Sequence, residues 1–467
     1  MTDKKKMDQD KTLKKDYVWN TIGSAVYALS AVVLSFLAMH FAGPEDGGIF
    51  GFGFSTFGQQ MFIIAYFGIR PFHITDVKHE YSYEDYRRLR VLTSLAAVAA
   101  AALYLLFMLA AGRYNGHKAL IIFVLALYKI ADGVADLYES ECQRSGFLWL
   151  GGQELTVRTI LAVAGFAAVL ILTGKLLLAC CTAVMVHAAA IVFFRGYLRR
   201  HVLSERMEGS LSSGISAVSY ESGGPTGKPQ LLTLETRRLF AGTVLLFLSV
   251  FVDFYIFSAS KYAIDLHLTD TDSGIFNVLF MPTSVIYLVA NFIIRPYMTR
   301  LADIYEKGEL PRFQKIVRLL SFNIAILSVL AAAGTLIVGR YVLMLFELLL
   351  GNKYHGVLIS HHWDFVLIIV GGCFYAVTNL YYYVLVIMRQ QKMIFFNYLC
   401  MAVVAYILTR RAVMGFGFEG ASTAYPLYML LTMFVFISTY HKELRKVKEK
   451  KEEDQQGGPS GGYSMYR

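Results

Sequence analysis

The sequence predicts an all-α polytopic membrane protein with about twelve transmembrane helices, arranged as two pseudo-twofold-related six-helix bundles. Three observations lead to this prediction. The 467 residues are 56% hydrophobic and 17% charged, and the mean hydropathy is +0.49, so the chain is more apolar than an ordinary soluble domain. Apolar stretches of about twenty residues, the length that crosses a bilayer core, recur along the chain. The third observation is an internal repeat.

The individual spans are predicted from the apolar stretches and their polar borders. The first span follows a Lys-rich segment that has no small-residue cleavage site, so we expect a retained helix and not a signal peptide. The stretch 341–351 is apolar but short, and it either extends the ninth span or lies at the membrane surface. The expected spans are 17–41, 49–70, 89–111, 119–141, 150–172, 176–195, 237–262, 274–296, 316–338, 363–388, 393–409 and 421–440.

The placement of Lys and Arg predicts that both termini face the cytoplasm. The N-terminal segment and the even-numbered connections carry most of the basic residues, whereas the connections 42–48 and 263–273 carry none. The connection 196–236 is rich in Gly and Ser, as a flexible linker is. The expected organisation is a basic cytoplasmic tail at 1–16, an N-terminal bundle at 17–195, a flexible cytoplasmic linker at 196–236, a C-terminal bundle at 237–440 and a cytoplasmic tail at 441–467.

The internal repeat relates the two halves of the chain. DGGIF at 46–50 returns as DSGIF at 272–276, and IRPF at 69–72 returns as IRPY at 294–297 with nearly the same spacing. We interpret this as an internal duplication. Each copy holds six spans, so both halves share one orientation, as in parallel-repeat transporters, with a central cavity expected between them.

Charged residues within the predicted spans are candidate functional residues, because they are costly in a bilayer. The fourth span carries Lys129, Asp132 and Asp136, and the fifth carries Glu154 and Arg158 four positions apart. Lys129 and Arg158 are candidate substrate-binding residues, and Asp132 and Asp136 are candidate ligands for a coupling ion. The alternative is that these side chains neutralise one another and serve only the structure.

Asp253 is a further candidate for the coupling site. It lies near the middle of the seventh span, with no oppositely charged residue three or four positions away. Such a carboxylate can bind a proton or a small cation such as sodium. The alternative is an Asp that is hydrogen-bonded to neighbouring helices.

Arg70 and Arg295 are the arginines of the repeated IRP motif. Each precedes a proline, which disfavours helical continuation, so both are expected where a helix ends at the cytoplasmic face. A pair of arginines there can act as a gate that binds pyrophosphate bidentately, or can merely anchor the topology. Asn291, one turn before Arg295, is expected to line the same mouth.

Several classes of function are not favoured by the sequence. The segment SGGPTGKP at 222–229 lacks the first Gly and the closing Ser or Thr of a P-loop, and no large outer loop could house a catalytic centre. The five cysteines show no metal-ligand spacing. The basic residues lie between the spans, which argues against nucleic acid as a partner. We therefore expect no enzyme activity, no catalytic residues, no cofactor and no metal site.

Two segments carry a family resemblance. YFGIRPFHITDVKHEYSYEDYRRLR at 66–90, which follows DGGIFGFGFS at 46–55, resembles the bacterial polysaccharide or O-antigen flippases. These belong to the multidrug/oligosaccharidyl-lipid/polysaccharide exporter (MOP) superfamily. GFGFEGASTAYPL at 415–427 resembles the Gly-rich entry to the last paired helix of that family, whereas the second half lacks the SYEDY run.

The resemblance implies a flippase in the bacterial cytoplasmic (inner) membrane. Its substrate would be an undecaprenyl-diphosphate-linked oligosaccharide, moved by alternating access to the outer leaflet for cell-surface polysaccharide biosynthesis. Membrane lipids and polysaccharide synthesis proteins are further expected partners. Two alternatives stay open: a cation-coupled multidrug exporter of the same superfamily, and a non-transporting membrane subunit of a polysaccharide synthase.

Overall fold

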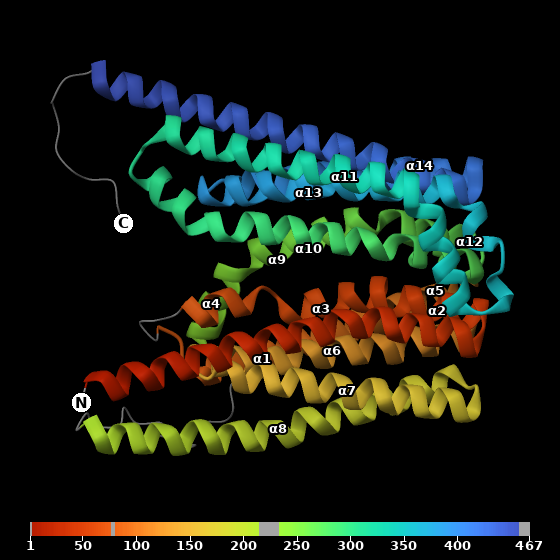
Figure 1. Cartoon of the computed structure of the whole chain (residues 1–467), viewed down its shortest axis with the longest axis horizontal. Helices are drawn as coiled ribbons and strands as arrows, with labels where there is room; N and C mark the ends of the chain where they lie inside the picture. The colour runs from red at the N-terminus through yellow and green to blue at the C-terminus, as the bar shows by residue number, and fades with distance from the viewer. Residues whose placement is uncertain (1, 76–79, 214–232, 457–467) are drawn as a thin grey trace. The chain divides into compact units, whose positions relative to one another are not determined.

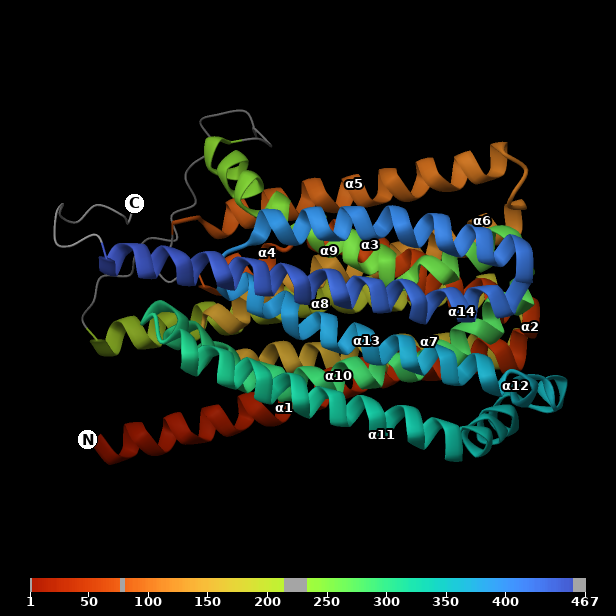
Figure 2. The ribbon, with the colours of Figure 1, turned by 90° about the horizontal axis from the view of Figure 1, so that it is seen from above.

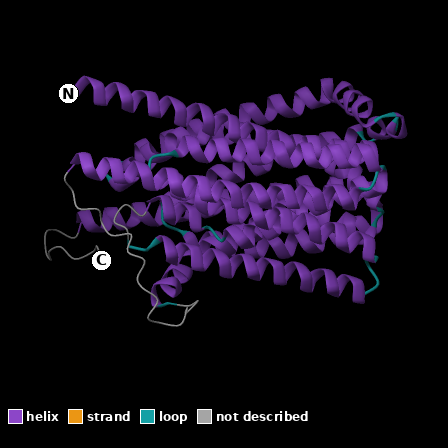
Figure 3. Cartoon of the chain, turned by 90° about the horizontal axis from the view of Figure 1, so that it is seen from below, coloured by secondary structure: helices purple, strands orange, loops and turns teal. Residues whose placement is uncertain are grey.

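The computed structural model describes residues 2–75, 80–213 and 233–456 (Figure 1). The regular secondary structure of these ranges is helical throughout, and Figure 3 shows it as purple ribbons joined by short teal loops. This confirms the predicted all-α fold.

Nine helices in the described ranges are long and apolar enough to cross a membrane. These nine cover ten of the predicted spans, because α14 (Gln391–Gln456) holds the last two, and the second and fourth predicted spans are present in another form. The second span is divided into α2 (Pro44–Phe52), a π-helical turn η2 (Gly53–Phe57) and α3 (Gly58–Tyr66). The fourth is α6 (Gly116–Arg144), whose middle is charged, and α14 is kinked at Gly417, between the last two. These segments together account for the twelve predicted spans.

The first compact unit comprises Met1–Val278 together with Met344–Leu358. In this unit α6 contacts α2, α3, α4, α5, α7 and α8, which makes α6 its central helix. The helices not yet given are α1 (Thr2–Leu37), the π-helical turn η1 (Ala38–Ala42), α4 (Ile69–Thr75), α5 (Tyr83–Ala110), α7 (Leu148–Thr173), α8 (Leu176–Ser213), α9 (Leu234–His267) and the start of α10 (Asp270–Glu306).

Small residues set the packing of α1 against α7. A Cβ atom added to Gly23 would lie 2.7 Å from the carbonyl oxygen of Gly152, and one added to Gly152 would lie 2.5 Å from the backbone of Trp19. Only glycine permits so close an approach of two helix backbones. Aromatic residues such as Phe50, Phe57 and Phe166 fill the core of the unit.

The second compact unit comprises Leu279–Leu343 and Ile359–Arg467. It holds the remainder of α10, most of α11 (Leu310–Leu350), α13 (His362–Ile387) and α14. The short η3 (Asn352–Tyr354) and α12 (Val357–Ser360) connect α11 to α13. Helices α13 and α14 pack along each other (Figure 2), and Gly371 allows this, because a Cβ there would lie 2.3 Å from the Tyr425 ring.

The two arginines of the repeat have different backbone surroundings. A helix ends close to Arg70 but before it: α3 ends at Tyr66, and Phe67 and Gly68 have positive φ angles of 50° and 66°. α4 then begins at Ile69 and contains both Arg70 and Pro71, so the proline does not end a helix at the arginine. The corresponding prediction for Arg295 is wrong, because α10 continues through Pro296 to Glu306. A helix-interior proline removes one hydrogen bond, and here that loss does not end the helix.

Helix also extends into the segments that flank the expected bundles. α1 begins at Thr2, α8 continues to Ser213, and α11 continues to Leu350, so that the stretch 341–351 extends the ninth span. Residues 214–232 of the expected linker lie outside the described residues. The domain limits inferred from the duplication differ from the limits of the compact units, and they stay a prediction.

Candidate functional site

A stripe of charged and polar side chains follows one face of α6. The stripe positions alternate in steps of three and four residues, which places them on one face of a helix. We use the name charge ladder for the stripe together with its partners. The stripe is Lys129, Asp132, Asp136, Glu139 and Gln143, and the partners are Tyr27, Arg70, Arg90, Glu154, Arg158 and His187.

Arg158 of α7 joins three carboxylates of the ladder. Its Nη1 donates to Asp132 Oδ1 at 2.8 Å, its Nη2 donates to Glu139 Oε1 at 2.9 Å, and its Nε lies 2.8 Å from Glu154 Oε1. His187 of α8 adds a ring nitrogen 3.1 Å from Asp132 Oδ1. The Arg158 side chain is 1% exposed. Such a buried guanidinium is tolerated only because carboxylates surround it.

Asp136 is bound by two further arginines from two other helices. Arg70 Nη1 donates to Asp136 Oδ1 at 2.8 Å, and Arg90 Nη2 donates to Oδ2 at 2.7 Å. Arg90 Nη1 also donates to the carbonyl oxygens of Ala65 and Tyr66, both at 2.8 Å. These carbonyls end α3, so Arg90 satisfies helix-terminal groups that have no partner within the helix.

Arg70 lies at the more accessible end of the ladder. Besides Asp136 it contacts Glu139 Oε2 at 3.2 Å and Gln143 Oε1 at 3.1 Å, yet 26% of its side chain stays exposed. A bound phosphate would have to compete with these carboxylates for the guanidinium.

Lys129 has the weakest ionic contact in the ladder. Its Nζ lies 3.8 Å from Asp132 Oδ2, donates to the Tyr27 hydroxyl at 3.2 Å, and lies 4.0 Å from the centre of the Phe54 ring. The side chain is buried, so the cation–π contact replaces part of the lost hydration. The Tyr27 hydroxyl in turn donates to Asp132.

The ladder is electrically balanced. Its four cations are Arg70, Arg90, Lys129 and Arg158, and its four carboxylates are Asp132, Asp136, Glu139 and Glu154. Balance explains how so many charges can be buried, because opposite charges in contact offset the loss of hydration. The arrangement favours mutual neutralisation of the predicted residues Lys129, Asp132, Asp136 and Arg158.

The other predicted site residues lie away from the ladder. Asp253 occupies a half-buried position on α9 of the first unit. In the second unit Asn291 is buried, donates to the Tyr287 carbonyl at 2.9 Å and accepts from Asn379 Nδ2 at 3.3 Å. Arg295 is exposed, and no ion pair joins it to another residue of the described ranges. Asn291 therefore packs against α13 and does not share the exposed surface of Arg295.

Sequence reasoning missed five residues of the ladder. Glu139 and Gln143 continue the three-and-four spacing beyond Asp136, so that spacing could have identified them. Arg90 shares a helix face with the buried Tyr86, Thr93 and Ala97, which is a weaker signal. Local sequence gives no comparable signal for Tyr27 or His187, since both are partners only through tertiary contact.

No protein-family model and no curated protein matches the chain. Solved structures match nearly all of it. The multidrug transporter DinF-BH of the MATE type aligns with a TM-score of 0.62 and 16% identity, over 92% of this chain and 95% of its own. The eukaryotic MATE transporter AtDTX14 aligns with a TM-score of 0.61 and 12% identity, over 95% and 99%. The fold is that of the MATE transporters.

A third MATE-type structure carries the superfamily name. It is an inward-facing multidrug resistance transporter of the MOP superfamily, with a TM-score of 0.57 and 12% identity, over 94% of this chain and 96% of its own. At 12–16% identity these likenesses show a shared fold, and the superfamily indicated by residues 46–90 stays a prediction. The narrower resemblance to O-antigen flippases stays a prediction.

Proposed function

We propose that this chain is an exporter of the MOP superfamily that works by alternating access. The observation that carries the proposal is the MATE-like fold over more than nine-tenths of the chain. The structural neighbours are transporters and not enzymes, in keeping with the expected lack of catalytic residues.

We further propose that the substrate is an undecaprenyl-diphosphate-linked oligosaccharide. The resemblance at 46–90 supports this, and so does the chemistry of the repeated arginines. The Arg70 guanidinium is partly exposed, and Arg295 is exposed without an ionic partner in the described ranges. A guanidinium binds phosphate oxygens bidentately, and Arg295 can do so without releasing a carboxylate.

Movement of the anionic head group is favoured by the membrane potential. Carrying one negative charge out of a negative interior is favourable by about 2.3 kcal/mol per 100 mV. Proton or sodium exchange at a carboxylate is the proposed second source of drive. Asp132 and Asp136 are bound by guanidinium groups. Asp253 is half-buried on α9, and it is the residue to vary in a test of coupling.

A multidrug exporter is the second candidate, and the names of the matching structures favour it. Such a carrier handles organic cations, which a phosphate-binding arginine would repel. The two proposals therefore predict different effects for removal of Arg295: reduced export of the lipid-linked glycan, or drug export that is unchanged or increased.

The deciding experiment compares a deletion strain with its parent and also uses proteoliposomes of the purified chain. We expect lipid-linked glycan to accumulate on the inner leaflet of the deletion strain, and we expect proteoliposomes to flip a fluorescent polyprenyl-diphosphate glycan. Increased drug sensitivity without glycan accumulation would contradict the flippase and support the drug exporter. Flipping that ignores voltage, sodium and pH would contradict the coupling proposal.

A further inference from the structure

The two copies of the repeated motif meet within the first unit. A Cβ on Gly48 would lie 1.7 Å from the Asp270 carbonyl oxygen, and a Cβ on Gly274 would lie 3.0 Å from the Gly48 Cα. The Ser55 hydroxyl donates to Asn277 Oδ1 at 3.1 Å. α2 and the start of α10 are thus in backbone contact, which requires glycine at Gly48.

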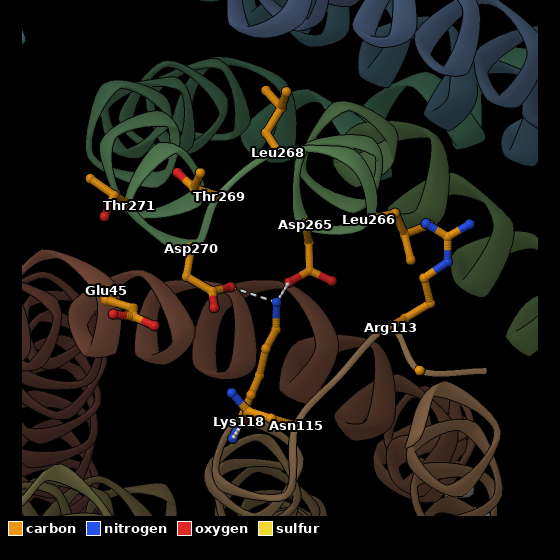
Figure 4. Close-up of a pocket in the computed structure, with 11 residues that line it drawn as sticks. Glu45, Arg113, Asn115, Lys118, Asp265, Leu266, Leu268, Thr269, Asp270 and Thr271 are labelled. Carbon is orange, nitrogen blue, oxygen red and sulfur yellow. Dashed lines mark hydrogen bonds and ion pairs between the residues drawn. The ribbon is translucent and has the colours of Figure 1, made fainter. Parts of the chain in front are cut away.

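A charged cluster connects the same start of α10 to two other helices. Lys118, at the start of α6, lies 2.8 Å from Asp265 Oδ1 and 2.5 Å from Asp270 Oδ1. Asp265 lies in the last turn of α9 and Asp270 begins α10, and Lys118 projects between them (Figure 4). The Tyr114 hydroxyl donates to the second oxygen of Asp265. Burial and the Asp265 carboxylate raise the pKa of Tyr114, so that hydroxyl keeps its proton.

The segment 344–358 contacts the same end of the first unit. The Tyr354 hydroxyl donates to the Met39 carbonyl at 3.3 Å, and His40 Nδ1 lies 3.1 Å from the Leu349 carbonyl oxygen. Met39 also faces α10, since a Cβ on Gly274 would lie 3.4 Å from Met39 Cε. The π-helical turn η1 therefore contacts two segments whose chains continue into the second unit, one at Leu279 and one before Met344.

The cluster of Lys118, Asp265 and Asp270 borders a cavity of about 630 Å³, so protein does not enclose it on every side. Polar side chains dominate the lining, with Glu45 and Arg113 beside the cluster (Figure 4). Separating a buried ion pair is costly when the charges stay dry. Water in a polar cavity can hydrate Lys118, Asp265 and Asp270 as they part, which makes this contact reversible.

We propose that Lys118, Asp265 and Asp270 form a releasable latch that holds the start of α10 against α2 and α6. While the latch is closed, Gly48 and Gly274 are in contact and Asn277 is buried. Release frees the start of α10 and so loosens one of the two segments that leave the first unit. That this release takes part in a transport cycle rests on the proposed function. The contact among Lys118, Asp265 and Asp270 does not depend on that function.

The test measures how fast a buried cysteine at the latch reacts. In a full-length chain whose five native cysteines are replaced, Asn277→Cys reports opening through alkylation by a polar maleimide, because Asn277 is 3% exposed. We expect Lys118→Met and Asp270→Asn to raise the alkylation rate at least 10-fold. The exchange Lys118→Asp with Asp270→Lys again places one lysine between two aspartates, and it should return the rate to within 3-fold of the parent.

Two controls separate latch release from general loosening. Arg113→Gln changes a residue that lines the same cavity but is not part of the latch, and it should leave the alkylation rate within 2-fold of the parent. A cysteine at the buried Thr378 of α13 should stay unreactive in every variant, since it reports unfolding of the second unit. The latch is refuted if Lys118→Met and Asp270→Asn leave the alkylation rate within 2-fold of the parent, or if Arg113→Gln raises that rate as much as they do. It is also refuted if the double variant Lys118→Asp with Asp270→Lys reacts as fast as the single variants.

A disulfide tests the transport role separately. Ser55→Cys with Asn277→Cys would join the π-helical turn η2, which follows α2, to α10, and Gly165→Cys with Thr182→Cys would join α7 to α8 as the control. We expect the first pair to block flipping until a reductant is added and the control pair not to block it. Flipping that persists through the first disulfide refutes the transport role. A parent without flipping refutes the proposed function, and the alkylation rates then decide the latch.

Discussion

The fourth and tenth spans, α6 and α13, occupy corresponding places in the two halves of the sequence but stabilise their units differently. The stripe of α6 buries Lys129, Asp132 and Asp136, and arginines of neighbouring helices pair with both aspartates and with the half-buried Glu139. Helix α13 carries one charged residue near its start, Asp364, which pairs with His361 and accepts from Ser422. Further along, it packs Gly371 and Gly372 against Tyr425 and Thr283, and Asn379 donates to Asn291.

The difference shows that duplicated helices need not keep the same source of stability. A small residue admits a neighbouring helix closely, so α13 relies on packing and neutral hydrogen bonds. A buried charge tolerates no missing partner, so α6 relies on a complete set of ion pairs. The first unit should therefore respond far more strongly to single substitutions in its core polar groups.

The largest expected effect follows the loss of Arg158. Arg158→Met leaves Asp132, Glu139 and Glu154 without their shared guanidinium, and it should lower the free energy of unfolding by about 3–5 kcal/mol. In the second unit, Asn379→Leu removes one neutral hydrogen bond and should lower it by about 0.5–1.5 kcal/mol. Thermal or denaturant unfolding of the purified variants measures both. Equal losses would contradict the contrast between α6 and α13.

The second-largest expected contrast is the stability loss on replacing Arg70 compared with that on replacing Arg295. Arg70→Ala removes contacts to Asp136, Glu139 and Gln143 and should cost about 1.5–3 kcal/mol of stability. Arg295→Ala should change stability by no more than about 0.5 kcal/mol. If Arg295 binds the diphosphate, its removal should still reduce glycan flipping about tenfold, corresponding to about 1.4 kcal/mol. Unchanged flipping with Arg295→Ala would remove this residue from the proposed site.

A glycine comparison tests the contact between the two motif copies. Gly48→Ala places a methyl group on the Asp270 carbonyl and should destabilise the first unit by about 1–3 kcal/mol. Gly334→Ala on α11 meets no atom within 4 Å and should stabilise its helix by about 0.5–1 kcal/mol. Unfolding measurements on both variants should give opposite signs, and a neutral Gly48→Ala would contradict the close approach.

The smallest expected effect concerns pH. Burial lowers the pKa of His73 on α4, although the nearby Glu141 opposes the shift. The unfolded chain then takes up the proton first, so stability falls as pH drops below about 6.5, the ordinary value for histidine. His73→Asn should flatten this decline by no more than about 1 kcal/mol between pH 7.5 and 5. A variant that loses stability as steeply as the parent would show that His73 does not cause the decline.

Much of the fold was predictable because its causes are local. The length and hydropathy of a segment decide whether it can cross a bilayer, so the apolar stretches alone indicated twelve spans. The repeated DGGIF and IRP motifs indicated two halves of six spans. The spacing of Lys129, Asp132 and Asp136 indicated one polar face on the fourth span, and the structure extends that face to Gln143.

What only the tertiary structure decided is which groups become partners. Tyr114 and Asp265 lie 151 positions apart, and Tyr27 and Asp132 lie 105 apart, so no local pattern joins them. The repeat predicted like surroundings for Arg70 and Arg295, yet one is held by carboxylates and the other is exposed. Hydropathy acts on one segment at a time, whereas burial and ion pairing depend on the neighbours that folding supplies, and these differ between the two halves.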